Sequence, residues 1–223
     1  VRMGSGVDND EIRAAILGGD YLVAQAFTML MSYASCEVVR TSVDALRDMA
    51  EGELSMLGDR SGARSQAACV ELARKKTGAL FAAACGTPCH LIAPNMFTMM
   101  HRYGMALGTA FQFVDDLLDL LQDEDALGKP ACGDVTEDKC TLPILFLREG
   151  LDGTGLARLD DITGTVVSAE DRQWIAEAVE STGARERTEA VARSFSAEAQ
   201  GVLGAMPPSA FRESLTGLAE FVL

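Results

Sequence analysis

The chain has 223 residues, and its 33 acidic and 19 basic side chains give a formal net charge of −14. This excess of acid argues against nucleic acids and anionic membrane surfaces as partners, since both attract clustered lysine and arginine. Hydrophobic residues make up 48% of the chain and charged residues 23%, which is typical of a packed globular protein and excludes a disordered one. Only 6% of residues are aromatic and β-branched residues seldom alternate, so we predict an all-α protein.

The sequence suggests a soluble protein from a reducing compartment. No segment has the roughly 18 uninterrupted apolar residues of a membrane helix, and the first ten residues do not resemble a signal peptide. The six cysteines follow no disulfide framework, which indicates free thiols and a cytoplasmic location. Cys85, Cys89 and His90 lie close together, either as a metal cluster that lacks a second ligand pair or as buried residues beside a Gly/Pro turn.

Apolar residues recur with helical spacing through the first half of the chain. A polar, glycine-containing turn at 58–62 ends the second helix, and Pro88 and Pro94 interrupt the connection between the third and the fourth. The predicted helices cover residues 12–31, 36–57, 66–85 and about 96–121.

The second half begins with an acidic segment, 122–139, that we predict to be an ordered loop with one or two short turns. An apolar pattern resumes at 141–148, and a glycine-rich turn follows at 150–155. Ser168 and Asp171 form a predicted capping box that opens a helix to about residue 180. Two more helices follow, one ending near 203 and one after Pro207 and Pro208; 162–167 is interpreted as a loop or a helix end. Without an internal repeat or linker, residues 1–223 are expected to form a single domain.

The most informative segment is 111–121, because a helix there places Asp115, Asp116 and Asp119 on one face. Gln112 and Asp123 continue the same spacing. A solvated stripe on an amphipathic helix has this pattern too, so periodicity alone leaves two interpretations, a water-exposed face or a cation site.

The composition of the stripe favours a cation. Like charges one helical turn apart destabilise a helix by roughly 0.2–0.5 kcal/mol per pair, and an ordinary solvated face would include lysine or arginine. Carboxylate ligands without His or Cys favour Mg²⁺, with Mn²⁺ as the alternative. Mg²⁺ held by few carboxylates completes its shell with water and substrate phosphates, so a phosphate-bearing substrate is expected.

Lysines that would complete a phosphate site occur on both sides of the stripe. Lys76 precedes Thr77 in the third predicted helix, and Lys129 and Lys139 flank the acidic loop. Each lysine alone is typical of a solvated surface charge, whereas their combination with the aspartates predicts anion binding. His101 is interpreted as a packing or surface residue rather than a base.

These segments together resemble the trans-type polyprenyl diphosphate synthases, whose fold is the all-α isoprenoid synthase bundle around a central active-site cavity. The aspartate-rich motif joined to a downstream two-lysine loop is the specific part, and the Thr-Leu-Pro ending of that loop is typical of bacterial geranylgeranyl and medium- to long-chain members. The resemblance follows the family's order from Gly19 to Pro143, and 215–223 is similar to its final helix. Its matching segments are 19–22, 51–54, 76–81, 111–119 and 128–143.

The resemblance implies a role for each matching residue. Asp115, Asp116 and Asp119 would bind Mg²⁺ that bridges to an allylic diphosphate, and Asp115, Asp116 and Lys76 would form the catalytic set. The implied reaction condenses isopentenyl diphosphate with the allylic diphosphate, giving a longer polyprenyl diphosphate and inorganic diphosphate, in a homodimer. Residues that would contact the allylic diphosphate or share its site are Lys76, Thr77, Gln112, Lys129 and Lys139.

The sequence also departs from the family. Members carry a first aspartate-rich motif and an Arg-Arg-Gly segment just before the helix that contains Gly19, but this chain begins at Val1 without them. We expect the chain as given to lack the N-terminal helices of the domain; the alternative is a protein that has lost half of its metal site. Met56 replaces a glutamine found in many relatives. A class I terpene cyclase and a non-catalytic synthase subunit are the alternative functions.

Overall fold

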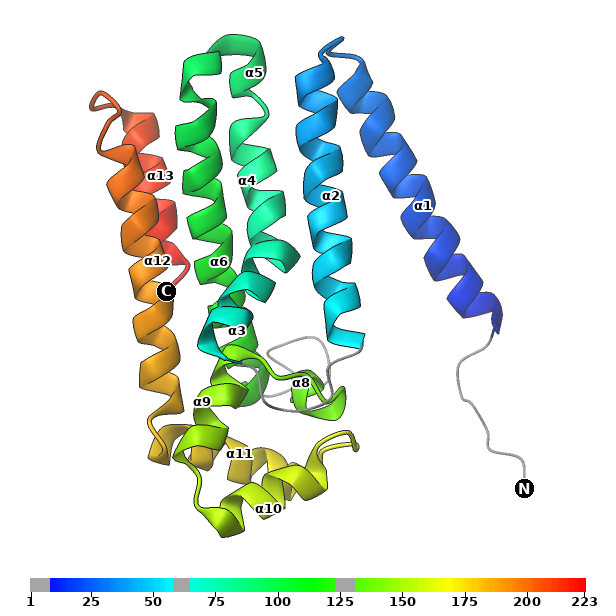
Figure 1. Cartoon of the computed structure of the whole chain (residues 1–223), viewed down its shortest axis with the longest axis vertical. Helices are drawn as coiled ribbons and strands as arrows, with labels where there is room; N and C mark the ends of the chain where they lie inside the picture. The colour runs from blue at the N-terminus through cyan, green and yellow to red at the C-terminus, as the bar shows by residue number, and fades with distance from the viewer. Residues whose placement is uncertain (1–8, 58–64, 123–130) are drawn as a thin grey trace.

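The computed structural model describes residues 9–57, 65–122 and 131–223, which form a bundle of helices with no strand among them (Figure 1). Lys129 therefore lies outside the described residues. The long helices are α1 (Asn9–Met31), α2 (Cys36–Leu57), α6 (Phe97–Leu121) and α12 (Ala184–Leu203). The shorter ones are α3 (Gln66–Ala73), α4 (Ala79–Gly86), α5 (Cys89–Ile92), α8 (Gly133–Thr136), α9 (Leu142–Gly150), α10 (Gly153–Ile162), α11 (Ala169–Ser181) and α13 (Ala210–Phe221).

Most predicted helices are confirmed, and the capping side chains explain where several of them begin. The Ser168 hydroxyl accepts the backbone N–H of Asp171 at 3.1 Å, as the capping box predicts. The predicted turn at 150–155 was wrong in part, because α10 begins inside it. Asp152 accepts the N–H of Gly155 at 2.7 Å, and this cap offsets the poor helix propensity of the glycines that follow.

The predicted third helix, 66–85, contains a break in its regular geometry. A single π turn, η1 (Arg74–Gly78), joins α3 to α4, and a 3₁₀ turn, η2 (Pro94–Met96), precedes α6. A π turn places one more residue in a turn than an α-helix does, and it rotates the side chains that follow relative to those before. Lys75, Lys76 and Thr77 all lie on this turn.

Helix α6 forms the centre of the bundle, with α4 packed on one side and α12 on the other (Figure 1). Its buried side chains join two hydrophobic clusters. Phe113 and Leu117 pack with α9 and α11 at one end. Tyr103 and Leu107 pack with α12 and α13 at the other, where the Tyr103 hydroxyl donates to the Leu215 carbonyl at 2.7 Å. The aspartate-rich segment therefore lies on the central helix, which packs against other helices along its length.

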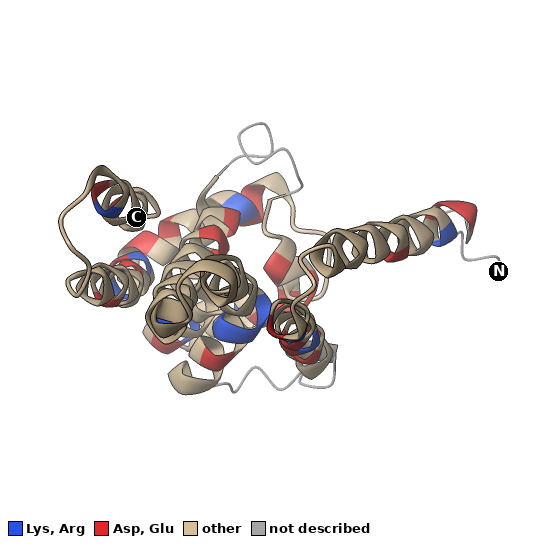
Figure 2. Cartoon of the chain, turned by 90° about the horizontal axis from the view of Figure 1, so that it is seen from above, with Lys and Arg blue, Asp and Glu red and all other residues tan. Residues whose placement is uncertain are grey.

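Helix α1 stands apart from the rest of the bundle and projects outward in Figure 2. By length and composition, its residues 10–31 form a helix that could cross a membrane, and none of that window is buried. The expectation that no segment would qualify was wrong on this criterion, because it counted only uninterrupted apolar residues and average hydropathy tolerates Asp20 and Gln25. Core helices of soluble proteins pass the same test, so the test by itself assigns no membrane.

Candidate active site

The three predicted aspartates and both described lysines of the predicted site line one pocket of about 420 Å³. Helix α6 contributes the aspartates, η1 contributes Lys76, and α8 with the residues after it closes the opposite wall. We call this the aspartate pocket; it is lined by Lys76, Asp115, Asp116, Asp119, Gly133, Asp134, Thr136, Glu137 and Lys139. Three separate segments of the chain thus converge on one site.

Burial of the acidic stripe counts against one of its two interpretations. Asp116 is 7% exposed and Asp119 is 4% exposed, while Asp115 is partly exposed. A solvated stripe would leave these carboxylates in water, so that interpretation is wrong for Asp116 and Asp119. Buried carboxylates are retained in proteins where they are paired, hydrogen-bonded or bound to a metal.

A hydrogen-bonded chain of side chains holds Asp116 in place. The Thr77 hydroxyl on η1 donates to the Gln112 carbonyl oxygen, and the Gln112 amide nitrogen donates to Asp116 Oδ1 at 2.6 Å. Gln112 lies one turn before Asp116 on α6, so the amide reaches the carboxylate without leaving its helix. Neither Thr77 nor Gln112 lines the aspartate pocket; they orient Asp116 and join η1 to α6.

Asp119 ties the far wall of the pocket to α6. Its Oδ2 accepts the backbone N–H of Asp134 at 3.1 Å, and its backbone carbonyl accepts the N–H of Cys132 at 2.8 Å. Cys132 has a φ of 55°, in the left-handed region, which lets the chain turn into α8. Asp119 therefore shapes the pocket as well as contributing a carboxylate to it.

The electrostatics of the aspartate pocket suit a cation. Burial first, and then the nearby Asp134 carboxylate, raise the pKa of Asp116 to about 8, against the opposing effects of Gln112 and Lys76. A divalent cation would stabilise the ionised carboxylates and relieve this repulsion. Among the described residues, no group of three or more His, Cys, Asp or Glu side chains forms a ready-made metal cluster. A cation here would need further oxygen ligands, such as water or a phosphate, which agrees with Mg²⁺ coordination chemistry.

Two basic groups face these carboxylates. Lys76 lines the pocket from η1, and Lys139 lies 2.5 Å from Glu137 Oε2. Although burial opposes it, the hydrogen bond to Glu137 raises the pKa of Lys139, so this side chain carries its charge. A pocket with cations and buried carboxylates can bind a polyanion and its counter-cation together.

Sequence reasoning missed part of the site. Asp134 and Glu137 line the pocket, but the sequence pattern identifies them only as part of an acidic loop; their spacing before Lys139 was the available signal. Met56, noted as a departure from the family, lines a small cavity beside Gln112 and Asp116. By contrast, His90 lies 3.0 Å from the Thr41 hydroxyl, a packing arrangement in which its ring also stacks on a phenylalanine.

Comparison with known proteins gives this geometry its family context. Residues 8–181 match the family model described as polyprenyl synthetase. The chain belongs to the polyprenyl synthetase family. It is 32% identical to a short chain isoprenyl diphosphate synthase from Methanothermobacter thermautotrophicus, over 97% of this chain and 73% of that protein. It is 31% identical to an octaprenyl diphosphate synthase from Escherichia coli, over 94% of this chain and 66% of that protein.

Solved structures of polyprenyl synthases show the same fold. A polyprenyl synthase from Caulobacter crescentus CB15, complexed with calcium and isoprenyl diphosphate, superposes with a TM-score of 0.89 at 30% identity. The match covers 94% of this chain and 65% of that one. The chain likewise spans 65% of a prenyl transferase from Cyanophora paradoxa, less than two thirds of that relative's length. The all-α isoprenoid synthase fold predicted from the sequence is confirmed.

Proposed function

We propose that this polyprenyl synthetase family member is a trans-prenyltransferase that condenses isopentenyl diphosphate with an allylic diphosphate. The observation that carries the proposal is the convergence of Asp115, Asp116 and Asp119 with Lys76 and Lys139 on one pocket. The Caulobacter relative, complexed with calcium and isoprenyl diphosphate, supports a divalent cation and a substrate of this class. Mg²⁺ is the cation we propose, since every acidic ligand is a carboxylate oxygen.

Residues of this chain would bind the diphosphate group of the allylic substrate and stabilise it as the leaving group. Asp115, Asp116 and Asp119 would hold the cation, which when bound neutralises charge on the diphosphate oxygens. Lys76 and Lys139 would bind those oxygens from the other walls and stabilise the negative charge that develops on the leaving group. Thr77 and Gln112 would keep Asp116 oriented. The C–O bond would then break to give an allylic carbocation, which the double bond of isopentenyl diphosphate attacks before a proton is lost.

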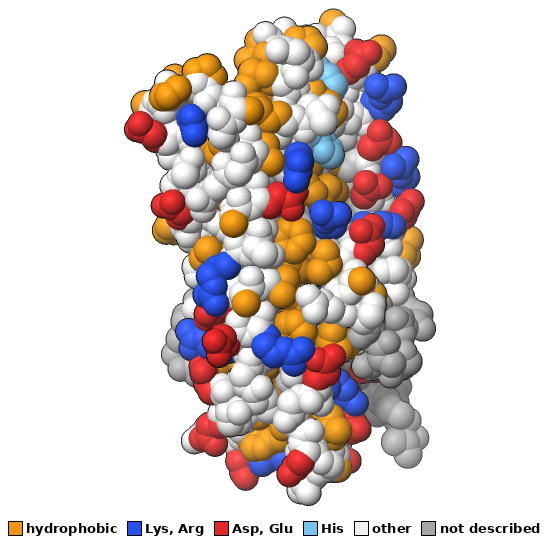
Figure 3. All heavy atoms as spheres, turned by 60° about the vertical axis from the view of Figure 1, so that its left-hand side comes forward, with side chains coloured by type: hydrophobic (Ala, Val, Ile, Leu, Met, Phe, Trp, Pro, Cys, Tyr) orange, Lys and Arg blue, Asp and Glu red, His pale blue; other side chains and the backbone are white. Residues whose placement is uncertain are grey.

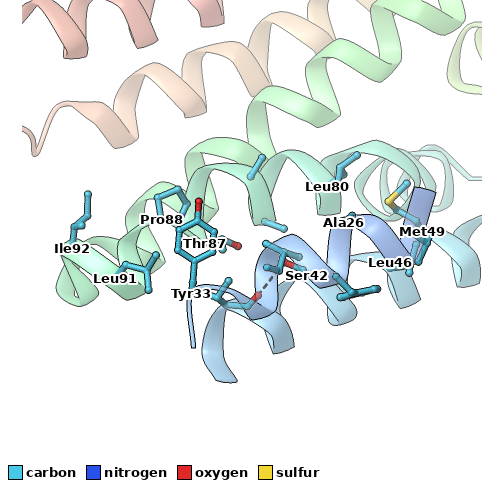
Figure 4. Close-up of a pocket in the computed structure, with 16 residues that line it drawn as sticks. Ala26, Tyr33, Ser42, Leu46, Met49, Leu80, Thr87, Pro88, Leu91 and Ile92 are labelled. Atoms are coloured by element: carbon cyan, nitrogen blue, oxygen red, sulfur yellow. Dashed lines mark hydrogen bonds between the residues drawn. The ribbon is translucent and has the colours of Figure 1, made fainter. Parts of the chain in front are cut away.

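An apolar pocket suits the prenyl tail. It measures about 680 Å³ and lies between α1, α2, α4 and α5, with Leu80, Leu46 and Met49 among its walls (Figure 4). Leu80 is one helical turn after Lys76, so a tail that leaves the aspartate pocket along α4 enters an apolar space. Pro88, Leu91 and Ile92 lie at its far end (Figure 4).

The proposed reaction has a direct test. The protein is incubated with Mg²⁺ and farnesyl diphosphate, with and without isopentenyl diphosphate, and the products are separated by chromatography. A longer prenyl diphosphate that forms only when isopentenyl diphosphate is present is the expected result. A hydrocarbon formed without isopentenyl diphosphate would instead make the protein a cyclase, and Mg²⁺-dependent diphosphate binding without turnover would make it a non-catalytic subunit.

Filling the apolar pocket should shorten the product. Ala84 lines the pocket two helical turns beyond Lys76, about 12 Å along α4. Ala84→Phe places a ring in the path of the tail, so we expect the longest product to lose one or more isoprene units with little change in stability. Ala190→Phe, on the exposed face of α12, is the matched control. Products of unchanged length from Ala84→Phe would exclude this route for the tail.

A homodimer that covers α1 is also part of the proposal. The charged side chains of α1 gather near its N-terminal end, apart from Asp20 (Figure 2). Large apolar side chains such as Leu17, Leu22 and Met29 are exposed along the rest of the helix. An aspartate near the middle of the helix disfavours burial in a bilayer, whereas a second copy would cover the apolar surface and leave Asp20 at a wet edge. The free thiols of all six cysteines support a cytoplasmic location for this assembly.

Placing a charge on α1 should separate the subunits. Leu22 is 68% exposed, and Leu22→Glu would put a carboxylate in the proposed interface without disturbing the core. We expect light scattering to give a dimer mass for the parent protein and a monomer mass for the variant. Leu218→Glu, at an exposed leucine of α13, should remain dimeric. A monomeric parent protein, or a dimeric Leu22→Glu variant, would contradict this interface.

A further inference from the structure

A second polar pocket, of about 410 Å³, shares no lining residue with the aspartate pocket. The same π turn contributes to both: Lys76 lines the aspartate pocket, whereas Arg74 and Lys75 line the second one. Helix α6 supplies His101, Arg102 and Met105 to its walls, and α12 supplies Glu198. We call this second pocket, defined by Arg74, Lys75, His101, Arg102, Met105 and Glu198, the rear pocket.

Arg74 is the unusual residue of the rear pocket. Its guanidinium carbon lies 5.8 Å from the centroid of the Phe195 ring, and its Nε is buried with no hydrogen-bond partner. Within the described residues Arg74 forms neither an ion pair nor a side-chain hydrogen bond. A guanidinium presents five N–H donors, and a buried donor left unpaired lowers stability by roughly 1–3 kcal/mol. The terminal guanidinium nitrogens also have no partner among the described residues but are not buried, so they are the donors that an anion in the rear pocket would reach.

The neighbouring charges are already balanced. Lys75 lies 3.1 Å from Glu51, Arg102 lies 2.8 Å from Glu198, and Asp48 lies 3.1 Å from Arg47. Glu71, the remaining acid in the walls, is exposed and forms no ion pair with Arg74 in the part of the chain that the structure describes. Arg74 is thus the one lysine or arginine of these walls that forms no ion pair among the described residues, while Lys75 and Arg102 retain further N–H donors beside it.

The shape and lining of the rear pocket indicate what kind of anion it fits. Ala79, Met105 and Ala106 give it an apolar floor, and this face of the molecule shows apolar side chains between basic and acidic ones (Figure 3). Its volume falls within the 300–1,000 Å³ typical of small-molecule sites. A guanidinium binds carboxylate and phosphate groups through paired hydrogen bonds. We propose that the rear pocket binds a small organic anion, with its phosphate or carboxylate group on Arg74 and its apolar part on Met105.

Calorimetric titration tests this proposal without any assay of turnover. Phenyl phosphate and benzoate are titrated separately into the protein in EDTA, so that no divalent cation supports binding at the aspartate pocket. We expect one of them to bind at a single site, which also identifies the preferred anionic group. Arg74→Ala should weaken that binding about tenfold or more, because it removes the charged donor group. Arg102→Ala, at an exposed side chain that is safe for folding, should weaken it several-fold.

Two further variants distinguish binding at the rear pocket from binding at the aspartate pocket and from attraction to surface charge. Lys76→Ala removes a cation from the aspartate pocket and should leave the affinity unchanged, and Arg193→Ala removes one positive charge from the exposed part of α12 and should do the same. The proposal is overturned if neither probe binds, if Arg74→Ala and Arg102→Ala both retain the parent affinity, or if Lys76→Ala abolishes binding. The last result would place the anion in the aspartate pocket.

Discussion

Replacing Asp116 by asparagine is expected to lower prenyl transfer by roughly two to three orders of magnitude, the size of effect seen when one electrostatic stabiliser is removed from an active site. Asparagine keeps the shape of the side chain and can still accept the hydrogen bond from Gln112, but it removes the negative charge that would bind the cation. Turnover with Mg²⁺, farnesyl diphosphate and isopentenyl diphosphate measures this effect. Mg²⁺-dependent binding of inorganic diphosphate should weaken in parallel.

The same substitution should leave the metal-free fold intact or make it more stable. Burial raises the pKa of Asp116 to about 8, so the folded chain loses stability as the pH rises from the ordinary carboxyl pKa to about 8, and the full cost of the buried charge is present above that pH. Asparagine has no such cost, and the melting temperature of Asp116→Asn at pH 9 should equal or exceed that of the parent. Asp161→Asn, on the exposed side of α10, serves as the control for one lost charge. Unchanged turnover in Asp116→Asn would remove Asp116 from the proposed mechanism.

The aspartate-rich helix shows how far local sequence patterns reach. Helical spacing placed Asp115, Asp116 and Asp119 on one face, and the structure confirms that all three line one pocket. The spacing could not show whether that face is exposed to solvent, because its burial depends on segments that are distant in the sequence. The segment after Cys132 covers Asp119, and η1 covers Asp116 through Thr77 and Gln112. The two interpretations, a solvated stripe and a cation site, predict the same helical spacing. Only these long-range contacts distinguish them.

The π turn was beyond the reach of periodicity. The residues of η1 lie inside the single continuous helix that the sequence predicts at 66–85, and the spacing of apolar residues did not distinguish a π turn from an α-helical one. Its stabilisation comes from other helices. Gly52 on α2 lets the backbone of Lys76 approach closely, since a Cβ at that position would lie 3.3 Å from the Lys76 nitrogen and 3.0 Å from Lys75 Cβ. The turn that carries the predicted lysine is thus held by a tertiary contact.

Two features were not predicted from the sequence, and the reasons differ. One is helix α10, and the other is the exposed apolar surface of α1. Gly153 and Gly155 led to the prediction of a turn. That prediction did not take into account that Asp152 caps the N-terminus of α10. For α1, the helix was predicted correctly, but periodicity contains no information about which surfaces a helix will find to pack against. Its exposed apolar side chains are visible only in the folded chain.

The second large effect is expected at the contact between α4 and α6. Gly104 lies on α6 against the backbone of α4, and a Cβ added there would lie 2.3 Å from the Phe81 carbonyl oxygen and 2.8 Å from the Ala82 Cα. Backbone atoms cannot swing aside as a flexible side chain can, so Gly104→Ala must push the two helices apart. Overpacking of this kind destabilises by about 1–3 kcal/mol or more, and we expect about 3 kcal/mol in chemical denaturation.

Alanine has a higher intrinsic helix propensity than glycine, which by itself would stabilise the protein. A loss of stability in Gly104→Ala would therefore report the steric contact between α4 and α6. Gly217 lies inside α13 with no neighbour within 4 Å of an added Cβ, so Gly217→Ala should stabilise the protein by about 0.5–1 kcal/mol. The same chemical change at two helical glycines should therefore give opposite signs. Because α4 continues from η1, a shift of α4 away from α6 also separates Thr77 from Gln112, so Gly104→Ala should weaken diphosphate binding even below its unfolding transition. Equal and small effects at both glycines would mean that α4 and α6 do not pack as closely as their backbones indicate.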